Sequence, residues 1–371
     1  MRGRGGPARR CRNGAGYQGR DTCQDPRPGE AGQSRPASAQ VARRSASRHC
    51  GTVPDLATLL PPPVLFFALG FFAGAVRSDL SVPDALARAL SLYLMVAIGL
   101  KGGVALATPG AAEGLWGALA GGVLLSLLLP LPAFLALRAA TRLDRATAAA
   151  VAGHYGSVSV VTFAAAAGIL QARGVAYEGF MPAVLAAMET PAILTALLLA
   201  RAGAPAGQRV PTRRLLREVL LNGSVVLLLG SFAIGWLGGA NAKAQLSVFT
   251  EGLFPGALCL FLLEMGLVAI RQLRAAGRGL QPALIGFGVL MPLFGAAGGL
   301  TAGTLAGLSP GGLGLMTVLG ASASYIAVPA AMRLALPEAD AGTYVTLSVA
   351  VTFPFNVVLG IPAYLWIAGA V

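Results

Sequence analysis

The sequence of 371 residues has few charged side chains, few histidines and few cysteines. Only 12% of its residues are charged and 55% are hydrophobic, whereas about a quarter of the residues of a soluble domain are charged. Cys11, Cys23 and Cys50 lie near the start of the chain without CxxC spacing, and Cys259 lies alone in an apolar run. A soluble domain, a disulfide framework and a metal site are therefore not expected.

Sequence motifs of well-known catalytic chemistry are also missing. The chain has no glycine-rich dinucleotide fingerprint, no phosphate-binding loop, no HExxH pair and no nucleophile elbow. Each of these motifs positions the groups that a particular reaction requires. We therefore predict that the protein is not an enzyme and that it holds no cofactor.

Acidic residues are scarcer than basic ones, and the imbalance is concentrated at the start of the chain. The net charge is +13, and residues 1–50 contain eleven arginines against Asp21, Asp25 and Glu30. This stretch has too little apolar surface to offset the entropy lost on folding. We predict a disordered basic tail over 1–52 without a nucleic-acid partner, or a mis-assigned start with the native protein beginning near Val53.

Long apolar runs fill the rest of the chain. A helix needs about 20 predominantly apolar residues to cross a bilayer core. Ten windows of about this length occur, at 57–77, 83–107, 112–137, 146–170, 176–200, 216–238, 249–270, 280–306, 312–334 and 341–369. The predicted fold class is an all-α integral membrane protein with about ten transmembrane helices.

Basic residues at alternate connections predict the orientation of these helices. Thirteen of them fall on one side of the membrane, and only Arg173 and Lys243 fall on the other. The positive-inside rule therefore places the arginine-containing linker 201–217 in the cytoplasm. This linker separates two predicted sets of five helices, 53–200 and 218–371.

The two halves resemble each other at an offset of 167 residues. Because each half has an odd number of helices, the second half enters the membrane from the opposite side. The arrangement predicts an inverted repeat, which places a substrate near the midplane at the repeat interface. The matching pairs are Gly99 with Gly266, Gly153 with Gly320, Ser157 with Ser324, Tyr177 with Tyr344 and, after a four-residue shortening, Pro191 with Pro354.

Small and hydroxyl residues occupy the middle of the fourth and ninth windows. We predict broken, crossing helices there, because Gly156 can adopt the backbone angles of an interruption and Pro329 obstructs a continuous helix. Half-helix N-termini favour a small anion, although small residues can also serve only for close packing. The predicted substrate-binding residues are Ser157, Val158, Ser159, Thr162, Ser322, Ala323 and Ser324.

Ionisable residues at membrane depth are costly and mark functional sites. Glu189 precedes a Thr-Pro pair in the fifth window, and its oxygens suit sodium, with a structural hydrogen bond as the alternative. Lys101 could neutralise an anion or snorkel from a helix end, and His154 could relay protons or form a packed hydrogen bond. Glu264 is interpreted as an interhelical or subunit contact. The predicted sodium-binding residues are Glu189, Thr190, Thr352 and Asn356.

At these residues the chain resembles the sodium-dependent bicarbonate permease family, the SbtA-type transporters. The resemblance runs from about Pro62 to Ile367. It rests on the stretches 97–103, 156–162, 177–179, 189–192 and 321–324, with Pro337. The chain departs from the family pattern at Val160 and Val161, in place of Gly and Ser, and at Tyr325, in place of Asp.

The resemblance implies a five-plus-five inverted topology with a core domain of crossed broken helices and a gate domain. It also implies a homotrimer in a bacterial inner membrane and, for some members, a PII-like regulatory protein on the cytoplasmic face. The implied function is sodium-coupled uptake of bicarbonate or a similar small anion by alternating access. The alternatives are a carrier for another small monocarboxylate, a proton-coupled carrier using Glu189 and His154, and a non-transporting membrane receptor or regulator.

Overall fold

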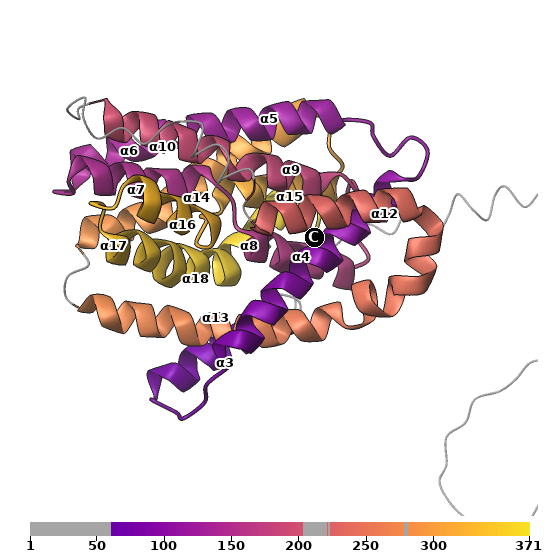
Figure 1. Cartoon of the computed structure of the whole chain (residues 1–371), viewed down its shortest axis with the longest axis horizontal. Coiled ribbons are helices and arrows are strands. Elements are labelled where there is room, and N and C mark those ends of the chain that lie inside the picture. Colours follow the sequence, from indigo (N-terminus) through magenta and orange to yellow (C-terminus); the bar gives the residue numbers. More distant parts are fainter. Residues whose placement is uncertain (1–60, 203–220, 222, 278–280) are drawn as a thin grey trace, which may run out of the picture. The chain divides into compact units, whose positions relative to one another are not determined.

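The computed structural model describes residues 61–202, 221, 223–277 and 281–371. The predicted tail 1–52 and all but the first two residues of the linker 201–217 lie outside this part of the chain. Within it, every regular element is a helix (Figure 1). The hydrophobic pattern therefore predicted the fold class correctly at the level of an all-helical chain.

The helices of the first half begin at α3 (Pro62–Ala75) and α4 (Asp84–Leu106). They continue as α5 (Leu115–Leu128), α6 (Pro130–Ala140), α7 (Arg145–Gly156), α8 (Val160–Ala172), α9 (Met181–Glu189) and α10 (Pro191–Arg201). The second half contains α12 (Gly223–Ser247), the π-helical η1 (Val248–Gly252), α13 (Phe254–Ala276), α14 (Pro282–Leu305), α15 (Pro310–Ala321) and α16 (Ala327–Ala335). It ends with α17 (Ala341–Thr346), η3 (Leu347–Thr352), α18 (Phe353–Phe355), η4 (Asn356–Gly360) and α19 (Ile361–Ile367).

Seven stretches of the described chain are long and apolar enough to cross a membrane. They are Asp84–Leu106, Leu115–Ala140, Arg145–Ala172, Met181–Arg201, Gly223–Ala276, Pro282–Leu305 and Ala341–Ile367. Seven is fewer than the ten predicted windows for two reasons. Pro62–Ala75 and Pro310–Ala321 are apolar but shorter, and Gly223–Ala276 has 54 residues. A straight helix of that length would measure about 80 Å, far more than the bilayer core of about 30 Å.

The long stretch Gly223–Ala276 changes direction twice. Gly239 has φ 47° and ψ −129°, which interrupts α12, and the π-helical η1 separates α12 from α13. A positive φ of this kind is accessible to glycine at little cost. The chain accordingly turns back after α12, and α12 and α13 run in opposite directions in Figure 1.

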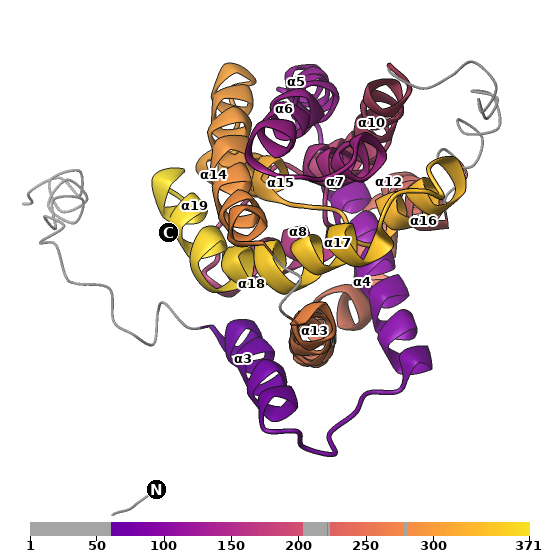
Figure 2. The same ribbon diagram turned by 90° about the vertical axis from the view of Figure 1, so that its left-hand side faces the viewer.

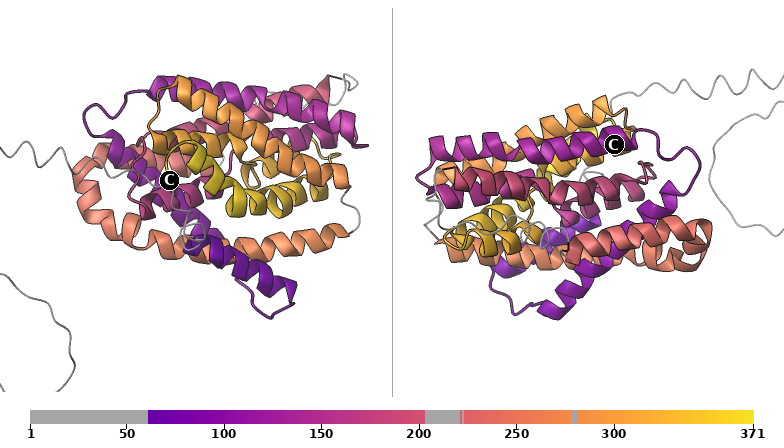
Figure 3. Two further views of the ribbon diagram at one scale, coloured as in Figure 1. Left: turned by 180° about the vertical axis from the view of Figure 1, so that it is seen from behind. Right: turned by 45° about the horizontal axis from the view of Figure 1, so that its top comes forward.

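The helices pack in two groups. In the four-helix group, α3 packs on α13 and α4 packs on α12. In the larger group, α14 packs on α15, α7 packs on both α6 and α10, and α5 packs on α9. Figure 2 shows α3 and α13 on one side of α8 and the helices α5, α6 and α14 on the other, and Figure 3 shows the same structure from two further directions.

Close contact between α4 and α12 depends on glycines. A Cβ atom on Gly103 would overlap the carbonyl oxygen of Phe232, and one on Gly235 would overlap that of Leu100. Small residues allow helix backbones to approach closely in membranes, where apolar burial drives association only weakly. The four-helix group is therefore tightly joined along α4 and α12.

The stretch that contains α7 and α8 is the most enclosed of the seven, because 83% of its apolar window is buried. Every residue of α15 from Gly311 to Ala321 is buried or nearly so, apart from the half-buried Leu313. The helices α8 and α15 lie in the middle of the described structure in Figure 1. Polar groups on these helices are consequently shielded from lipid.

Candidate functional site

The helices α7 and α15 begin with the same kind of cap. Asp144 caps α7 and Ser309 caps α15, each by accepting a hydrogen bond from the backbone amide three residues on. The two caps are 165 residues apart, and each helix has 12 residues. In this region the predicted offset of 167 is therefore corrected to 165, which pairs Ser157 with Ser322 rather than with Ser324.

Both helices are followed by an interruption at the same point. Ser157 and Ser322 directly follow α7 and α15, and both have extended backbones, with ψ 177° and 160°. The chain becomes helical again at Val160, where α8 begins, and at Ala327, where α16 begins. The interruptions are thus Ser157–Ser159 and Ser322–Ile326.

The residues expected to cause these interruptions act differently from the prediction. Gly156 does not have a positive φ, and a Cβ atom there would overlap the Pro130 ring, so this glycine allows close packing. Pro329 lies in the first turn of α16, where a backbone amide has no acceptor within the helix. It therefore obstructs nothing, and the extended serines mark the interruptions instead.

The two interruptions are hydrogen-bonded to each other. The Ser159 amide donates to Ser322 Oγ at 3.1 Å, and Ser322 Oγ donates to the Leu319 carbonyl at 2.9 Å. The Ser324 amide donates to the His154 carbonyl at 2.9 Å. These bonds replace the helical hydrogen bonds that an extended backbone loses, so the polar backbone remains satisfied in an apolar surrounding.

The N-terminus of α8 is capped within the same region. Ser159 Oγ accepts a hydrogen bond from the Thr162 amide at 3.2 Å, and Ser324 Oγ lies 3.4 Å from the Val328 amide in the first turn of α16. A helix N-terminus carries about half a positive elementary charge. Two such ends therefore meet at the interruptions.

A third discontinuity, between α9 and α10, adjoins them. α9 ends at Glu189 and α10 begins at Pro191. Ser126 Oγ, from α5, donates to the Met188 carbonyl at 2.7 Å and accepts from the Ala192 amide at 3.1 Å. A hydroxyl group thus takes the place of the direct i to i+4 hydrogen bond at this kink, a recognised cause of helix bending.

A small cavity lies where the three discontinuities meet. Its volume is about 10 Å³, which is close to the minimum needed for one water molecule. The lining residues are Met95, Val158, Ser159, Val160, Glu189, Ser224, Ser324, Tyr325, Ile326 and Ala327. Met95 belongs to α4 and Ser224 to α12, so the cavity lies between the two helix groups.

Two polar atoms at this cavity lack a partner. Glu189 is 3% exposed, and its Oε2 has no hydrogen bond within the described part of the chain. Tyr325 Oη is near enough to Ser159 to interact with its side chain, but it forms no hydrogen bond of acceptable geometry with any described residue. Buried polar groups are normally satisfied, so the two atoms indicate a place for a missing partner.

Four of the residues predicted from sequence line this cavity: Val158, Ser159, Ser324 and Glu189. Four more adjoin it without lining it. Ser157 Oγ donates to the Glu189 carbonyl at 3.1 Å, and Ser322 joins the two interruptions as described above. Thr162 and Ala323 are buried beside them.

The remaining residues of the predicted sodium site do not line the cavity. Thr190 lies at the junction of α9 and α10 and provides no side-chain cap. Thr352 Oγ1 donates to the Gly288 carbonyl at 2.7 Å, and it accepts from Tyr155 Oη at 2.6 Å. Asn356 Nδ2 donates to the carbonyl of Ala321, the last residue of α15, at 2.8 Å. The structure therefore does not bring Thr352 and Asn356 together with Glu189.

His154 and Lys101 also have defined partners. His154 Nδ1 lies 2.7 Å from the Ala150 carbonyl, and its ring stacks on Tyr344 at 4.6 Å between centroids. Lys101 Nζ donates to Gln171 Oε1 at 2.7 Å. The His154 geometry matches the packed hydrogen bond that the sequence left open as an alternative.

Two other acidic residues have structural partners. Glu264 forms an ion pair with Arg271, seven residues further along α13, at 2.6 Å, so this partner lies on the same helix and not on another one, and the predicted subunit contact stays a prediction. Glu178 Oε1 accepts a hydrogen bond from the Ser309 amide at 2.6 Å. Glu178 thereby adds a negative charge at the N-terminus of α15, where it is electrostatically favourable.

Sequence reasoning missed several residues of the site, among them Tyr325, Met95, Ser224 and Ser126. Tyr325 was noted only as a departure from a family pattern, and Met95 and Ser224 carry no distinguishing signal. Ser126 could have been found, because it is the one hydroxyl residue in the apolar sequence of α5. A lone buried hydroxyl in such a helix indicates a partner on a neighbouring helix.

Comparison with known proteins agrees with this architecture. The seven long apolar stretches are typical of a multi-pass membrane protein, and no curated protein matches the chain. The family model of the Na⁺-dependent bicarbonate transporter superfamily matches residues 62–369, nearly all of the described chain. The chain therefore belongs to the Na⁺-dependent bicarbonate transporter superfamily.

Proposed function

We propose that this protein is a secondary active transporter that takes up bicarbonate, or a similar small anion, together with sodium. The observation that carries this proposal is the cavity in which Glu189 Oε2 and Tyr325 Oη lack partners. The membership of the chain in a family of Na⁺-dependent transporters supports it. Different groups at the cavity would bind the sodium ion and the anion.

The carboxylate of Glu189 would hold the sodium ion. Hard cations prefer oxygen ligands, and the hydroxyl groups of Ser159, Ser324 and Tyr325 line the same cavity. Glu189 is retained from the ligand set expected from sequence. Thr352 and Asn356 are left out of the proposal, because their polar atoms already bond to other helices.

The N-termini of α8 and α16 would hold the anion. Val160 and Ala327, the first residues of these helices, line the cavity, and helix N-termini favour negative charge. The ionised Glu189 would repel an anion about 5 Å away by about 3 kcal/mol at an effective dielectric constant of 20. Sodium bound to Glu189 would cancel this repulsion, and anion binding would therefore depend on sodium.

Alternating access would come from movement of the four-helix group against the larger group. The cavity has barely enough room for one water molecule, and its lining includes residues of both groups. A relative displacement of the groups would widen it toward one side. We interpret the matching caps and interruptions of α7 and α15 as the centre of an inverted repeat, which is the usual basis of such movement.

The same proposal includes a cytoplasmic linker over 201–217, as the positive-inside rule predicts. Placement in a bacterial inner membrane, a homotrimeric assembly and a PII-like regulatory partner on the cytoplasmic face follow from the family resemblance. These features are part of the proposal, and the cavity itself does not depend on them.

Uptake of radiolabelled bicarbonate into proteoliposomes tests this function. We expect uptake to be saturable and to be inhibited by unlabelled bicarbonate more strongly than by acetate or formate. Stronger inhibition by a monocarboxylate would favour the alternative substrate. Uptake driven by a proton gradient without sodium would favour proton coupling through Glu189, and the absence of uptake of any of these anions would favour a receptor.

A further inference from the structure

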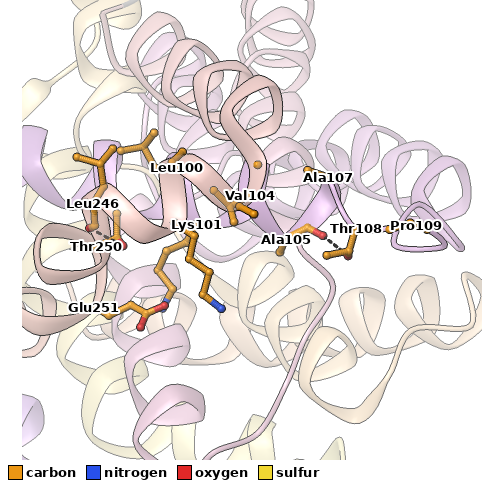
Figure 4. A pocket seen from close by; sticks show the side chains of 14 residues that line it. Leu100, Lys101, Val104, Ala105, Ala107, Thr108, Pro109, Leu246, Thr250 and Glu251 are labelled. Atoms are coloured by element: carbon orange, nitrogen blue, oxygen red, sulfur yellow. Dashed lines mark hydrogen bonds between the residues drawn. The ribbon is translucent and has the colours of Figure 1, made fainter.

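A second, larger cavity lies at the far end of α4. It has a volume of about 550 Å³ and is lined by the last turns of α4, by the part of α12 that follows Gly239, and by η1. Figure 4 shows its lining side chains. We call this cavity the vestibule. With the linker 201–217 in the cytoplasm, the vestibule lies at the external end of the helices.

The charges in the vestibule are predominantly positive. Lys101 and Lys243 line it together with a single carboxylate, Glu251. Lys101 is half-buried, whereas Lys243 and Glu251 are exposed. Figure 4 shows Lys101 and Glu251 extending to the same side of the cavity. Apolar walls with an excess of one charge strengthen the local field and attract ions of the opposite sign.

Lys101 is held at the wall of the vestibule by two contacts. Its Nζ donates to Gln171 Oε1 at 2.7 Å and lies 5.8 Å from the ring centre of Phe254. The ammonium group has three donors, of which the bond to Gln171 uses one. Because Lys101 is in α4 and Gln171 is in α8, this hydrogen bond joins the four-helix group to α8.

The helix α8 connects the vestibule with the midplane cavity. Val160 at its first residue lines the cavity, and Gln171 near its last residue bonds to Lys101 at the vestibule. The eleven steps between them correspond to about 17 Å along a helix. The vestibule is thus a separate place, on the external side of the cavity.

We propose that the vestibule is a second binding site, specific for small oxyanions, in which Lys101 and Lys243 hold the anion before it reaches the midplane cavity. The choice of bicarbonate as the probe rests on the proposed function. The two donors of Lys101 that Gln171 leaves free would bind the anion. The site therefore concentrates substrate at the external end of the helices.

Chemical modification of a cysteine in the vestibule tests this proposal without transport. Thr108 is exposed and lines the vestibule, so Thr108→Cys in a cysteine-free background, purified in detergent, is the reporter. Its reaction rates with an anionic and a cationic methanethiosulfonate give a ratio that reports local charge. Neutralising one lysine, by Lys101→Gln or Lys243→Gln, should lower the anionic-to-cationic ratio by at least about threefold.

The matched variant Glu251→Gln should raise the same ratio. Thr304→Cys provides a control reporter, because Thr304 is exposed near the end of α14 and does not line the vestibule. Its ratio should not respond to these three substitutions. A Thr108→Cys ratio that is also unresponsive to both lysine substitutions would overturn the proposal.

Protection by bicarbonate tests binding itself. At constant pH and ionic strength, with gluconate as the balancing anion, bicarbonate should slow modification of Thr108→Cys by both reagents, and Lys101→Gln should abolish this protection. Ser159→Ala, at the midplane cavity, should leave it unchanged. Absence of protection in the parent protein, or its loss in Ser159→Ala, would reject a separate external site. Neither result would decide whether the protein transports bicarbonate, which the proteoliposome assay measures independently.

Discussion

At the scale of single residues, the candidate site depends on a few hydroxyl groups and one carboxylate in an apolar surrounding. Sequence reasoning identified Glu189, Ser159 and Ser324, because polar residues are costly at membrane depth and therefore stand out. It could not identify which polar atoms lack partners, since that depends on the neighbouring helices. Thr352 resembles Ser324 in the sequence, yet its hydroxyl bonds to Gly288 and Tyr155.

The hydroxyl groups of Ser159 and Ser324 are predicted to contact a transported solute. Ser159→Ala and Ser324→Ala would each remove a hydroxyl group that donates to the anion or coordinates sodium, and losing a hydrogen bond to a charged group costs about 1.5 to 3 kcal/mol. Apparent affinity for the anion or for sodium should therefore fall roughly ten- to hundredfold, as measured by the concentration dependence of uptake. Ser159→Ala also removes the cap of α8, so its thermal stability should fall by about 1 kcal/mol.

Ser348→Ala is the matched control for these two variants. Ser348 is buried, and its hydroxyl donates to the backbone carbonyl of Tyr344, four residues earlier in the chain. Ser348 does not line the cavity. Its transport constants should remain those of the parent protein. If Ser159→Ala and Ser324→Ala also transport with unchanged constants, both hydroxyls are packing residues and the proposed site is wrong.

At the scale of helices, the positions of the helices were easier to predict than the causes of their interruptions. The windows 83–107 and 280–306 agree closely with α4 and α14, because a long apolar run has few alternatives to a helix in lipid. The window 57–77 begins five residues before α3, which starts at Pro62. The interruptions at Ser157–Ser159 and Ser322–Ile326 fall within the predicted segments but result from extended serines, and not from Gly156 or Pro329.

The discontinuity between α9 and α10 gives a test at this scale. Ser126→Ala removes the hydroxyl that bridges the Met188 carbonyl and the Ala192 amide, and the two backbone groups then lack partners, at a cost of about 1 to 3 kcal/mol. Because Glu189 lies between the two bridged residues in the chain, we expect Ser126→Ala to weaken the apparent affinity for sodium and to lower the melting temperature. Sodium titrations of uptake and thermal unfolding measure the two effects.

A neighbouring hydroxyl distinguishes positioning from general stability. Thr195 Oγ1 donates to the Leu127 carbonyl at 3.0 Å and lies 3.4 Å from the Pro191 carbonyl, so it links α10 to α5 without bonding to Met188 or Ala192. Thr195→Val should therefore lower stability while leaving the sodium dependence of uptake unchanged. Equal sodium affinity in Ser126→Ala and Thr195→Val would show that the Ser126 bridge does not position Glu189.

At the scale of the whole molecule, the sequence predicted the all-helical membrane class and the family. The number of membrane crossings cannot be counted directly from the lengths of the helices. α3 and α15 are too short to be recognised as spans by length, and α12 with α13 forms one continuous apolar stretch. Hydropathy alone does not locate the turn at Gly239 and η1. The family match over residues 62–369 agrees with a resemblance that rested on motifs from both halves.

The proposed orientation predicts which connections face the outside of the cell. Single cysteines in place of Ser78 and Thr108, in a cysteine-free background, lie in exposed connections before and after α4. Because α4 separates them and basic residues favour the cytoplasm, an impermeant maleimide should label Thr108→Cys in intact cells and should label Ser78→Cys only after permeabilisation. Strong labelling of Ser78→Cys in intact cells would reverse the orientation.

The central claim, that sodium bound near Glu189 drives anion uptake, is tested most directly by accumulation of labelled bicarbonate in proteoliposomes under an inward sodium gradient. The account predicts accumulation above equilibrium, its loss when a sodium ionophore removes the gradient, and its loss in Glu189→Gln, which keeps the shape of the side chain without its charge. Accumulation that is equal with and without the sodium gradient, or that persists with unchanged sodium dependence in Glu189→Gln, would contradict it.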